Sequence, residues 1–368
     1  MGRVDGDGPA LPRSGRSDER PRRGGPAVNF QRYLSAKRTV DERALNPRVE
    51  DRLAAELDGR DARDDPLRVL EVGAGIGASV VRLLGRSWLP NRVTYTALDV
   101  KRENVACARE RLPTRASALG YAVGRASDER ARASAAADAN DQHASADGRF
   151  VCSRGRRRVE VEFRTADAFD YLAATDEAVD LLVAHAFVDL VDPDRALSVF
   201  RDALAPDGLA YCPITFDRGT IFQPVADPEF EARLTEAFHR HLDRTGDSRA
   251  GRRLLSAAVG GREQSGGRDG DGGSGSDGDT DAGDGGASGS GGLLAAGGSD
   301  WVVHPRDGDY PADEGYFLQC IVEMVESAVR AESAIDDDRL SAWVARRRDQ
   351  IDRGELVYVA HQLDVLAR

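Results

Sequence analysis

Three glycines, Gly73, Gly75 and Gly77, lie close together in the sequence, and the carboxylate of Glu71 precedes them. Glycine adopts positive φ angles without steric cost and lets a ligand approach the backbone where a Cβ would collide. The first N–H groups of a helix have no intrahelical partner and can donate to such a ligand. Three glycines exceed what close packing alone requires, so this turn is a candidate binding site.

The elements around the turn are predicted by hydrophobic periodicity. Residues 67–72 form an apolar run typical of a buried strand, and Ile76, Val80 and Leu84 recur at helical spacing after the glycines. A second predicted strand, residues 92–99, ends in Asp99, about twenty residues beyond the turn. An acid at this point can accept hydrogen bonds from both hydroxyls of a ribose, although it can also cap the next helix.

The acidic-x-Gly-x-Gly-x-Gly pattern of Glu71 to Gly77 resembles motif I of the class I S-adenosylmethionine-dependent methyltransferases. The same glycines with Ala78 also fit the dinucleotide fingerprint G-x-G-x-x-A, so they do not choose between the two cofactors. Two further positions match the methyltransferases in order. They are Asp167, after a third predicted strand, and the turn at Pro206 to Gly208, where Asp207 replaces a glycine of the family's L-x-P-G-G.

The resemblance implies a Rossmann-like, doubly wound α/β fold with a seven-stranded, mainly parallel sheet whose last strand is antiparallel and lies between the fifth and sixth. Periodicity by itself predicts only alternating strands and helices. The cofactor that the resemblance implies is S-adenosyl-L-methionine, with Asp167 and the backbone of Ala168 next to its adenine ring; Asp170 is a weaker alternative. The implied donor-binding residues are Glu71, Gly73, Ala74, Gly75, Gly77, Asp99, Val100, Asp167, Ala168 and Ala184.

The fourth predicted strand, residues 181–184, ends at His185 and Asp189, which we predict as catalytic residues. Ligands of open α/β sheets bind outside the carboxyl ends of the strands, where a methyl acceptor would meet the donor. Many methyltransferases of the family have a histidine near the position of Asp189, and a satisfied histidine or a helix cap is the alternative for these two residues. The predicted acceptor-binding residues are Tyr33, Phe187, Phe216, Asp217 and Trp301. Tyr33 and Lys37 are also candidate lid residues on a leading helix, and the alternative is that this helix only packs on the surface of the domain.

The domain organisation predicted from composition is a single domain at residues 27–368 after a disordered tail at 1–26. Leading helices are expected within 28–57, with a break at Pro47. Residues 115–157 and 260–292 are rich in small and polar residues and cannot bury enough apolar area to offset ordering, so both are predicted to be flexible insertions. A loop is expected at 215–220, a sixth strand at 293–305 and a closing strand at 356–365.

Composition restricts the partners and the compartment. The net charge of −12 repels nucleic acid on average, and no apolar stretch is long enough to span a membrane, so we expect a small-molecule acceptor. The four cysteines form no C-x-x-C pair, which favours a reducing cytoplasm, and we predict no metal site. Only Lys37 and Lys101 are lysines among 51 basic residues, and with the acidic surface this indicates a salt-adapted cytoplasm such as that of a halophilic archaeon.

Two other classes of function remain open. An NAD(P)-dependent oxidoreductase would use the same glycine turn, but it would continue into a second domain with its own nicotinamide chemistry. A non-catalytic S-adenosylmethionine-binding protein would bind the donor without transferring a methyl group. The sequence does not indicate the oligomeric state.

Overall fold

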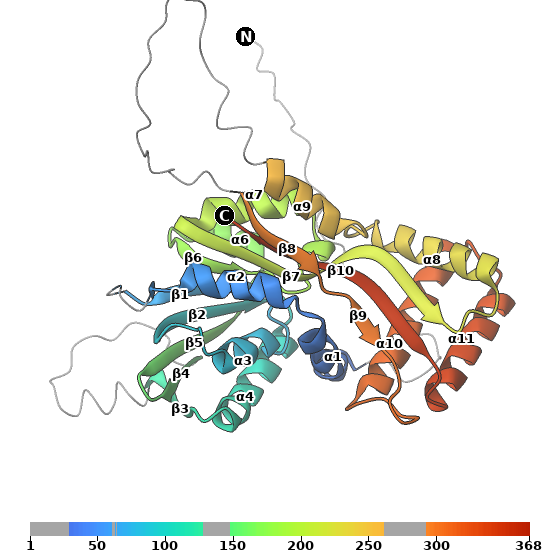
Figure 1. Ribbon diagram of the computed structural model, residues 1–368, viewed down its shortest axis with the longest axis horizontal. Helices are drawn as coiled ribbons and strands as arrows, with labels where there is room; N and C mark the ends of the chain where they lie inside the picture. The colour runs from blue at the N-terminus through green and yellow to red at the C-terminus, as the bar shows by residue number, and fades with distance from the viewer. Residues whose placement is uncertain (1–28, 61–62, 64, 128–147, 261–291) are drawn as a thin grey trace, which may run out of the picture.

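The computed structural model describes residues 29–60, 63, 65–127, 148–260 and 292–368 (Figure 1). The predicted N-terminal tail lies outside these residues. The helices are α1 (Phe30–Ala44), α2 (Pro47–Leu57), α3 (Ala78–Gly85), α4 (Arg102–Ala118), α6 (Ala168–Ala174), α7 (Pro193–Ala203), α8 (Pro228–Leu242), α9 (Ala250–Gly260), α10 (Glu314–Glu332) and α11 (Asp337–Asp352), with a short 3-10 turn η2 (Val188–Leu190). The strands are β1 (Leu67–Val72), β2 (Arg92–Asp99), β3 (Ala122–Arg125), β4 (Arg149–Arg154), β5 (Arg157–Thr165), β6 (Val179–Val183), β7 (Leu204–Gln223), β8 (Leu293–Gly298), β9 (Trp301–Val303) and β10 (Val357–Ala367).

A 10-stranded sheet forms the centre of the fold, in the order β3-β4-β5-β2-β1-β6-β7-β10-β8, with β9 paired to β10. Strands β5, β2, β1, β6 and β7 run parallel to one another. Strand β10 is antiparallel to both β7 and β8 and lies between them. The predicted fold class, with a reversed last strand between the fifth and sixth strands, is therefore confirmed, and β3, β4 and β9 are additional to it.

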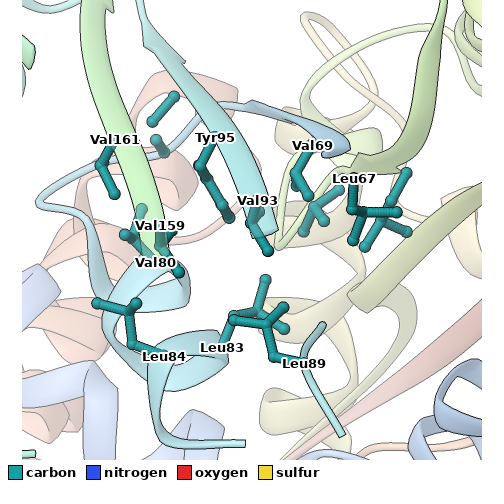
Figure 2. Close-up of a cluster of buried hydrophobic side chains, with 14 of the residues drawn as sticks. Leu67, Val69, Val80, Leu83, Leu84, Leu89, Val93, Tyr95, Val159 and Val161 are labelled. Atoms are coloured by element: carbon teal, nitrogen blue, oxygen red, sulfur yellow. The ribbon is translucent and has the colours of Figure 1, made fainter. Parts of the chain in front are cut away.

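Helices cover both faces of the parallel part of the sheet, because the strand residues are apolar on both sides. Leu67 and Val69 of β1 face α3 and α4, in the cluster of buried side chains shown in Figure 2. Leu70 and Val72 face the opposite side, where they pack in a cluster with residues of α6, α7 and α9. The strand is therefore buried on both faces, as expected for a central strand of a parallel sheet.

Strands β7 and β10 extend beyond the parallel part and carry a second layer of helices, α8, α10 and α11 (Figure 1). A third apolar cluster holds this layer, and α1 contributes Tyr33, Ala36 and Val40 to it. Helix α1 therefore belongs to the helical layer, while Leu34 on the same helix lies against the glycine turn after β1.

Three predicted boundaries were wrong. Helix α4 continues to Ala118, and β3 and β4 form an antiparallel extension of the sheet edge, so the insertion predicted at 115–157 is too wide. The expected loop at 215–220 is part of β7, whose pairing with β10 contains register shifts there and whose Arg218 has a positive φ. The sixth strand is divided into β8 and β9. Most of the predicted insertion at 260–292 lies outside the described residues.

Among the described helices, none has the length and apolar character that crossing a membrane requires.

Candidate active site

The turn between β1 and α3 has the backbone geometry that its glycines predict. Gly73, Gly75 and Gly77 all have positive φ, at 67°, 55° and 76°. Ala74 is buried, and its N–H donates to the carbonyl of Leu98 at the end of β2, 2.8 Å away. The turn is thereby fastened to the strand that delivers Asp99.

Asp99 is buried against this turn and accepts three hydrogen bonds. Its Oδ2 lies 2.8 Å from the N–H of Gly75, and its Oδ1 accepts from the N–H of Lys101 at 2.7 Å and from Nδ2 of Asn104 at 3.2 Å. A carboxylate has about four acceptor positions, so one remains on Oδ2. The next residue, Val100, is an apolar side chain that is 67% exposed. The donor-binding roles of both residues stay predictions.

Glu71 lies beneath α3 and not at the surface of the turn. It is buried with Tyr95, whose hydroxyl donates to its Oε2 at 2.8 Å. Burial raises the pKa of Glu71 to about 7, although hydrogen bonds from Tyr95 and Ser79 oppose the rise. This carboxylate therefore contacts buried side chains of β2 and α3, and its role in donor binding stays a prediction.

Asp167 caps α6. Its Oδ1 accepts from the N–H groups of Phe169 and Asp170 at 2.8 and 3.1 Å, and its side chain is exposed. This cap does not exclude adenine binding, because Oδ2 of Asp167 has no hydrogen-bond partner among the described residues. Ala168, the first residue of α6, is buried.

The segment after β6 turns back over the glycines. Ala184 is fully buried, Ala186 has a positive φ of 48°, and Phe187 follows. The Phe187 ring lies so close to Gly73 that a Cβ on the glycine would be 2.7 Å from Cδ2. A Cβ on Gly75 would likewise be 3.3 Å from Cδ1 of Leu34 on α1. Two apolar side chains therefore cover the turn in this structure.

A buried cluster centred on Asp41 of α1 lies beside the turn. Asp41 Oδ2 accepts from Lys37 Nζ at 2.6 Å and contacts His185 Nε2 at 3.0 Å, and its Oδ1 accepts from Trp301 Nε1 at 2.9 Å. Burial by itself would raise the pKa of Asp41, but Lys37 and His185 hold it well below its usual range. The cluster joins α1 to the ends of β6 and β9 through one ionised carboxylate.

The protonation of His185 follows from its two partners. Arg82 Nη1 lies 3.3 Å from Nδ1, and because a guanidinium only donates, Nδ1 is the acceptor and Nε2 carries the proton that goes to Asp41. Burial and the nearby Arg82 cation lower the pKa of His185 to about 4, so the imidazole is neutral at pH 7. Both ring nitrogens are occupied, so in this arrangement His185 orients Asp41. Its predicted catalytic role is untested.

Asp189, in η2, is the second residue predicted to be catalytic. Its Oδ1 is buried and has no hydrogen-bond partner among the described residues. Burial raises its pKa to about 6, while a hydrogen bond from its own backbone N–H and the positive charge of Lys37 oppose the rise. An acid with this pKa is ionised at pH 7 and still basic enough to accept a proton from a bound molecule.

The predicted acceptor-binding residues divide into two groups. Tyr33 stacks on Phe317 at 5.7 Å between ring centroids, and Trp301 packs edge-on against the same ring at 5.4 Å. These three aromatic side chains form one cluster, which contacts Asp41 through Trp301. Asp217 is instead paired with Arg252 at 2.8 Å and anchors the start of α9.

Phe216 packs on His239 of α8, 5.8 Å away between ring centroids. It lies at the edge of the apolar cluster that contains Tyr33 and Trp301. The acceptor-binding roles of Phe216 and Asp217 remain predictions.

Sequence reasoning missed Asp41, Arg82 and Asn104, although all three contact predicted site residues. The spacing of Lys37 and Asp41, four residues apart on one helix, was a visible signal for an ion pair. Arg82 and Asn104 carry no such signal, because an arginine or asparagine on an amphipathic helix is usually solvated. In the described residues, no group of three or more His, Cys, Asp or Glu side chains could hold a metal ion.

No protein-family model matches the chain, and neither does any curated protein. Among solved structures, an S-adenosylmethionine-dependent methyltransferase from Geobacter sulfurreducens in complex with S-adenosyl-L-homocysteine is similar, with 12% identity, a TM-score of 0.36, and coverage of 92% of this chain and 97% of that one. A putative methyltransferase from Thermoplasma acidophilum has 11% identity and a TM-score of 0.32, covering 82% and 67%. A mycolic acid cyclopropane synthase complexed with S-adenosyl-L-homocysteine has 11% identity and a TM-score of 0.33, covering 84% and 83%. These likenesses concern the fold and do not assign an activity to this chain.

Proposed function

We propose that the protein is an S-adenosylmethionine-dependent methyltransferase that transfers a methyl group to a small molecule. The observation that carries the proposal is the position of β10, antiparallel between β7 and β8, in a sheet whose first strand leads into the glycine turn. This arrangement is what the motif resemblance implies for the class I methyltransferases. The doubly wound sheet of a dinucleotide-binding domain shares the order 3-2-1-4-5 of the five parallel strands but continues with a sixth strand in the order 3-2-1-4-5-6, whereas here the antiparallel β10 lies next to the fifth strand.

The residues at the turn fit an adenosyl group. Glycine at positions 73 and 75 leaves the backbone approachable, and Asp99 retains acceptor capacity for a ribose hydroxyl after its three observed hydrogen bonds. Asp167 and the N–H of Ala168 would serve the adenine ring, and Val100 offers it an exposed apolar surface. Phe187 and Leu34 cover the turn, so they must shift when a ligand enters.

S-Adenosyl-L-methionine supplies, when bound, a methyl group already activated on a sulfonium. The work left to this chain is to hold the acceptor in line with that methyl group, which can contribute about 7–11 kcal/mol in favourable cases. Tyr33, Phe187 and Trp301 provide aromatic surface for this purpose, next to the closing helix α1.

Asp189 would take the proton of an acceptor that carries one, since its buried Oδ1 is free among the described residues and its pKa lies near 6. His185 would hold Asp41, and through it α1, in place. A small, partly apolar acceptor with an O–H or N–H group suits this environment better than nucleic acid does, given the net charge of −12.

The first experiment is calorimetric titration of the protein with S-adenosyl-L-methionine, S-adenosyl-L-homocysteine and NAD(H). We expect the two adenosyl compounds to bind and NAD(H) not to bind. Asp99→Ala should weaken donor binding roughly 10- to 100-fold, the range for loss of a hydrogen bond to a charged group of about 1.5–3 kcal/mol. For the adenine site, Asp167→Ala should weaken binding more than the matched change Asp170→Ala on the same turn of α6.

Incubation with radiolabelled methyl donor and a fractionated metabolite extract then tests transfer. Label in a small-molecule fraction, lost in Asp189→Asn, supports the enzyme. Binding of NAD(H) in place of the donor would favour an oxidoreductase, and donor binding without transfer to any fraction would favour a non-catalytic binding protein.

We also propose that the protein works in a salt-adapted cytoplasm such as that of a halophilic archaeon. The acidic surface and the near absence of lysine support this proposal. Thermal unfolding measured against KCl concentration tests it: the midpoint should rise with salt, and equal stability without salt would contradict the proposal.

A further inference from the structure

We propose that Asn104 is a positioning residue that links the ribose-binding carboxylate of Asp99 to the covering helix α1 through Gln31. Through this link, occupancy of the donor site and closure of α1 depend on each other. The identity of the ligand rests on the proposed function, but the link itself is a property of this chain's own side chains.

The link is a continuous set of hydrogen bonds. Gln31 Nε2 on α1 donates to Asn104 Oδ1 at 3.1 Å, Asn104 Nδ2 on α4 donates to Asp99 Oδ1 at 3.2 Å, and Gly75 donates to Oδ2 of the same carboxylate at 2.8 Å. The Asn104 side chain is buried, with 2% of its residue surface exposed. A buried amide without partners is costly, so Asn104 needs both of these neighbours.

Asp99 determines which atom of each amide donates and which accepts in these hydrogen bonds. An ionised carboxylate only accepts, so Asn104 must present its NH₂ group to Asp99 and therefore its oxygen to α1. Gln31 must in turn present its own NH₂ group. The carboxylate of Asp99 therefore determines, through Asn104, that Gln31 of α1 must act as a hydrogen-bond donor.

Helix α1 is placed to respond. Leu34 covers Gly75, and Phe30 lies 3.9 Å from Lys101 Nζ, so its first turns face the donor site. The other side of the helix is joined to the N-cap and first residue of α10 by ion pairs of Arg32 with Asp313 and of Arg43 with Glu314. A ligand at Asp99 displaces the Leu34 side chain from Gly75 and packs beneath α1 in its place, while Gln31 still reaches Asn104, so the ligand and the closed helix stabilise each other. Two sites coupled in this way affect each other equally.

A matched control exists on the same two helices. Ser35 of α1 accepts from Arg111 Nη2 of α4 at 2.8 Å, and this bond does not involve Asn104 or Asp99. Ser35→Ala removes a contact between α1 and α4 without touching the link. Gln31→Glu keeps the shape of the side chain but replaces its donor by an acceptor, which faces the oxygen of Asn104.

The test measures amide hydrogen exchange in α1, with and without S-adenosyl-L-homocysteine, in the full chain. In the wild type we expect the ligand to slow exchange. Gln31→Glu should exchange about 2- to 10-fold faster without ligand, the effect of one lost neutral hydrogen bond, and should lose the slowing by the ligand. Ser35→Ala should keep that slowing, and an equal loss in both variants would overturn the proposal.

A double-mutant cycle without ligand separates this proposal from the proposed function. The effects of Asp99→Asn and Gln31→Glu on α1 exchange should be non-additive, whereas those of Asp99→Asn and Ser35→Ala should add. Additivity in both cycles would refute the link even if the donor binds. Non-additivity in the first cycle alone would support the link even if no adenosyl compound binds, in which case only the proposed function fails.

Discussion

Replacing the buried carboxylate of Glu71 by an amide should change how the stability of the protein depends on pH. Glu71 is 1% exposed beneath α3, where the positive charge of Arg82 favours its ionised form and the negative charge of Asp99 opposes it. Burial raises its pKa from 4.5 to about 7. In the unfolded chain the same carboxyl ionises near its ordinary value, so the two states bind protons differently between these pH values.

Ionisation of the buried Glu71 carboxyl destabilises the folded state relative to the unfolded chain. Because the folded pKa of Glu71 is raised, the stabilising effect of its proton is complete below pH 4.5 and is lost as the pH rises through about 7. At about 1.4 kcal/mol for each tenfold change in the ionisation constant, the loss is about 3 kcal/mol. The amide of Glu71→Gln cannot ionise, so this variant does not lose stability in this way as the pH rises.

Urea unfolding of the wild type and of Glu71→Gln at a series of pH values and constant KCl measures the difference. The stability of Glu71→Gln relative to the wild type should increase by about 3 kcal/mol between pH 4.5 and 8, whatever the constant cost of the amide. Glu162→Gln is the control with the opposite sign: burial would raise the pKa of Glu162, but Arg164 and Arg149 lower it. Parallel curves for the wild type and Glu71→Gln would refute the reasoning.

Three further predictions concern the site and its support. Asp41→Ala leaves the buried Lys37 ammonium unpaired and should destabilise the protein by about 3–5 kcal/mol in chemical denaturation, with a normal midpoint contradicting the ion-pair cluster. Gly73→Ala places a methyl group 2.7 Å from the Phe187 ring at a φ of 67°, so the melting temperature should fall, and Phe187→Ala in the same chain should recover part of the loss. Arg347→Met removes a fully buried guanidinium that pairs with Glu231 of α8, so the free energy of unfolding should fall by about 3–5 kcal/mol in the same assay. A fall of less than about 1 kcal/mol would show that the ion pair is dispensable.

The sequence predicted the parallel part of the fold well, because its signals are local. The strand from Arg92 to Asp99 has the predicted bounds, since an apolar run and a closing acid define it within a few residues. The bounds were wrong where long-range pairing decides. Residues 215–220 are polar and contain a glycine, which favours a loop, but pairing with β10 holds them in a strand.

The part of the site that has a local sequence signal was predicted, and the part that depends on long-range contacts was not. The glycine turn and Asp99 belong to one local motif, and the structure brings them into contact. The Asp41 cluster joins residues from α1, α3, the end of β6 and β9, and nothing in the sequence near Asp41 indicates that His185 and Trp301 will meet it. Long-range contacts of single polar residues leave no periodic pattern in a sequence, so they become visible only in the structure.

The reversed strand has a consequence for how the chain reaches its folded state. Within the described residues, β8 and β9 join the sheet only through β10, and β10 also covers the outer edge of β7. Such pairings between distant segments form slowly. Until they form, β7 presents a long row of unpaired amides and carbonyls that can recruit the same edge of another molecule. The species most prone to aggregate is therefore a late folding intermediate with an intact glycine turn, and conditions that loosen β10 should cause precipitation before the donor site itself unfolds.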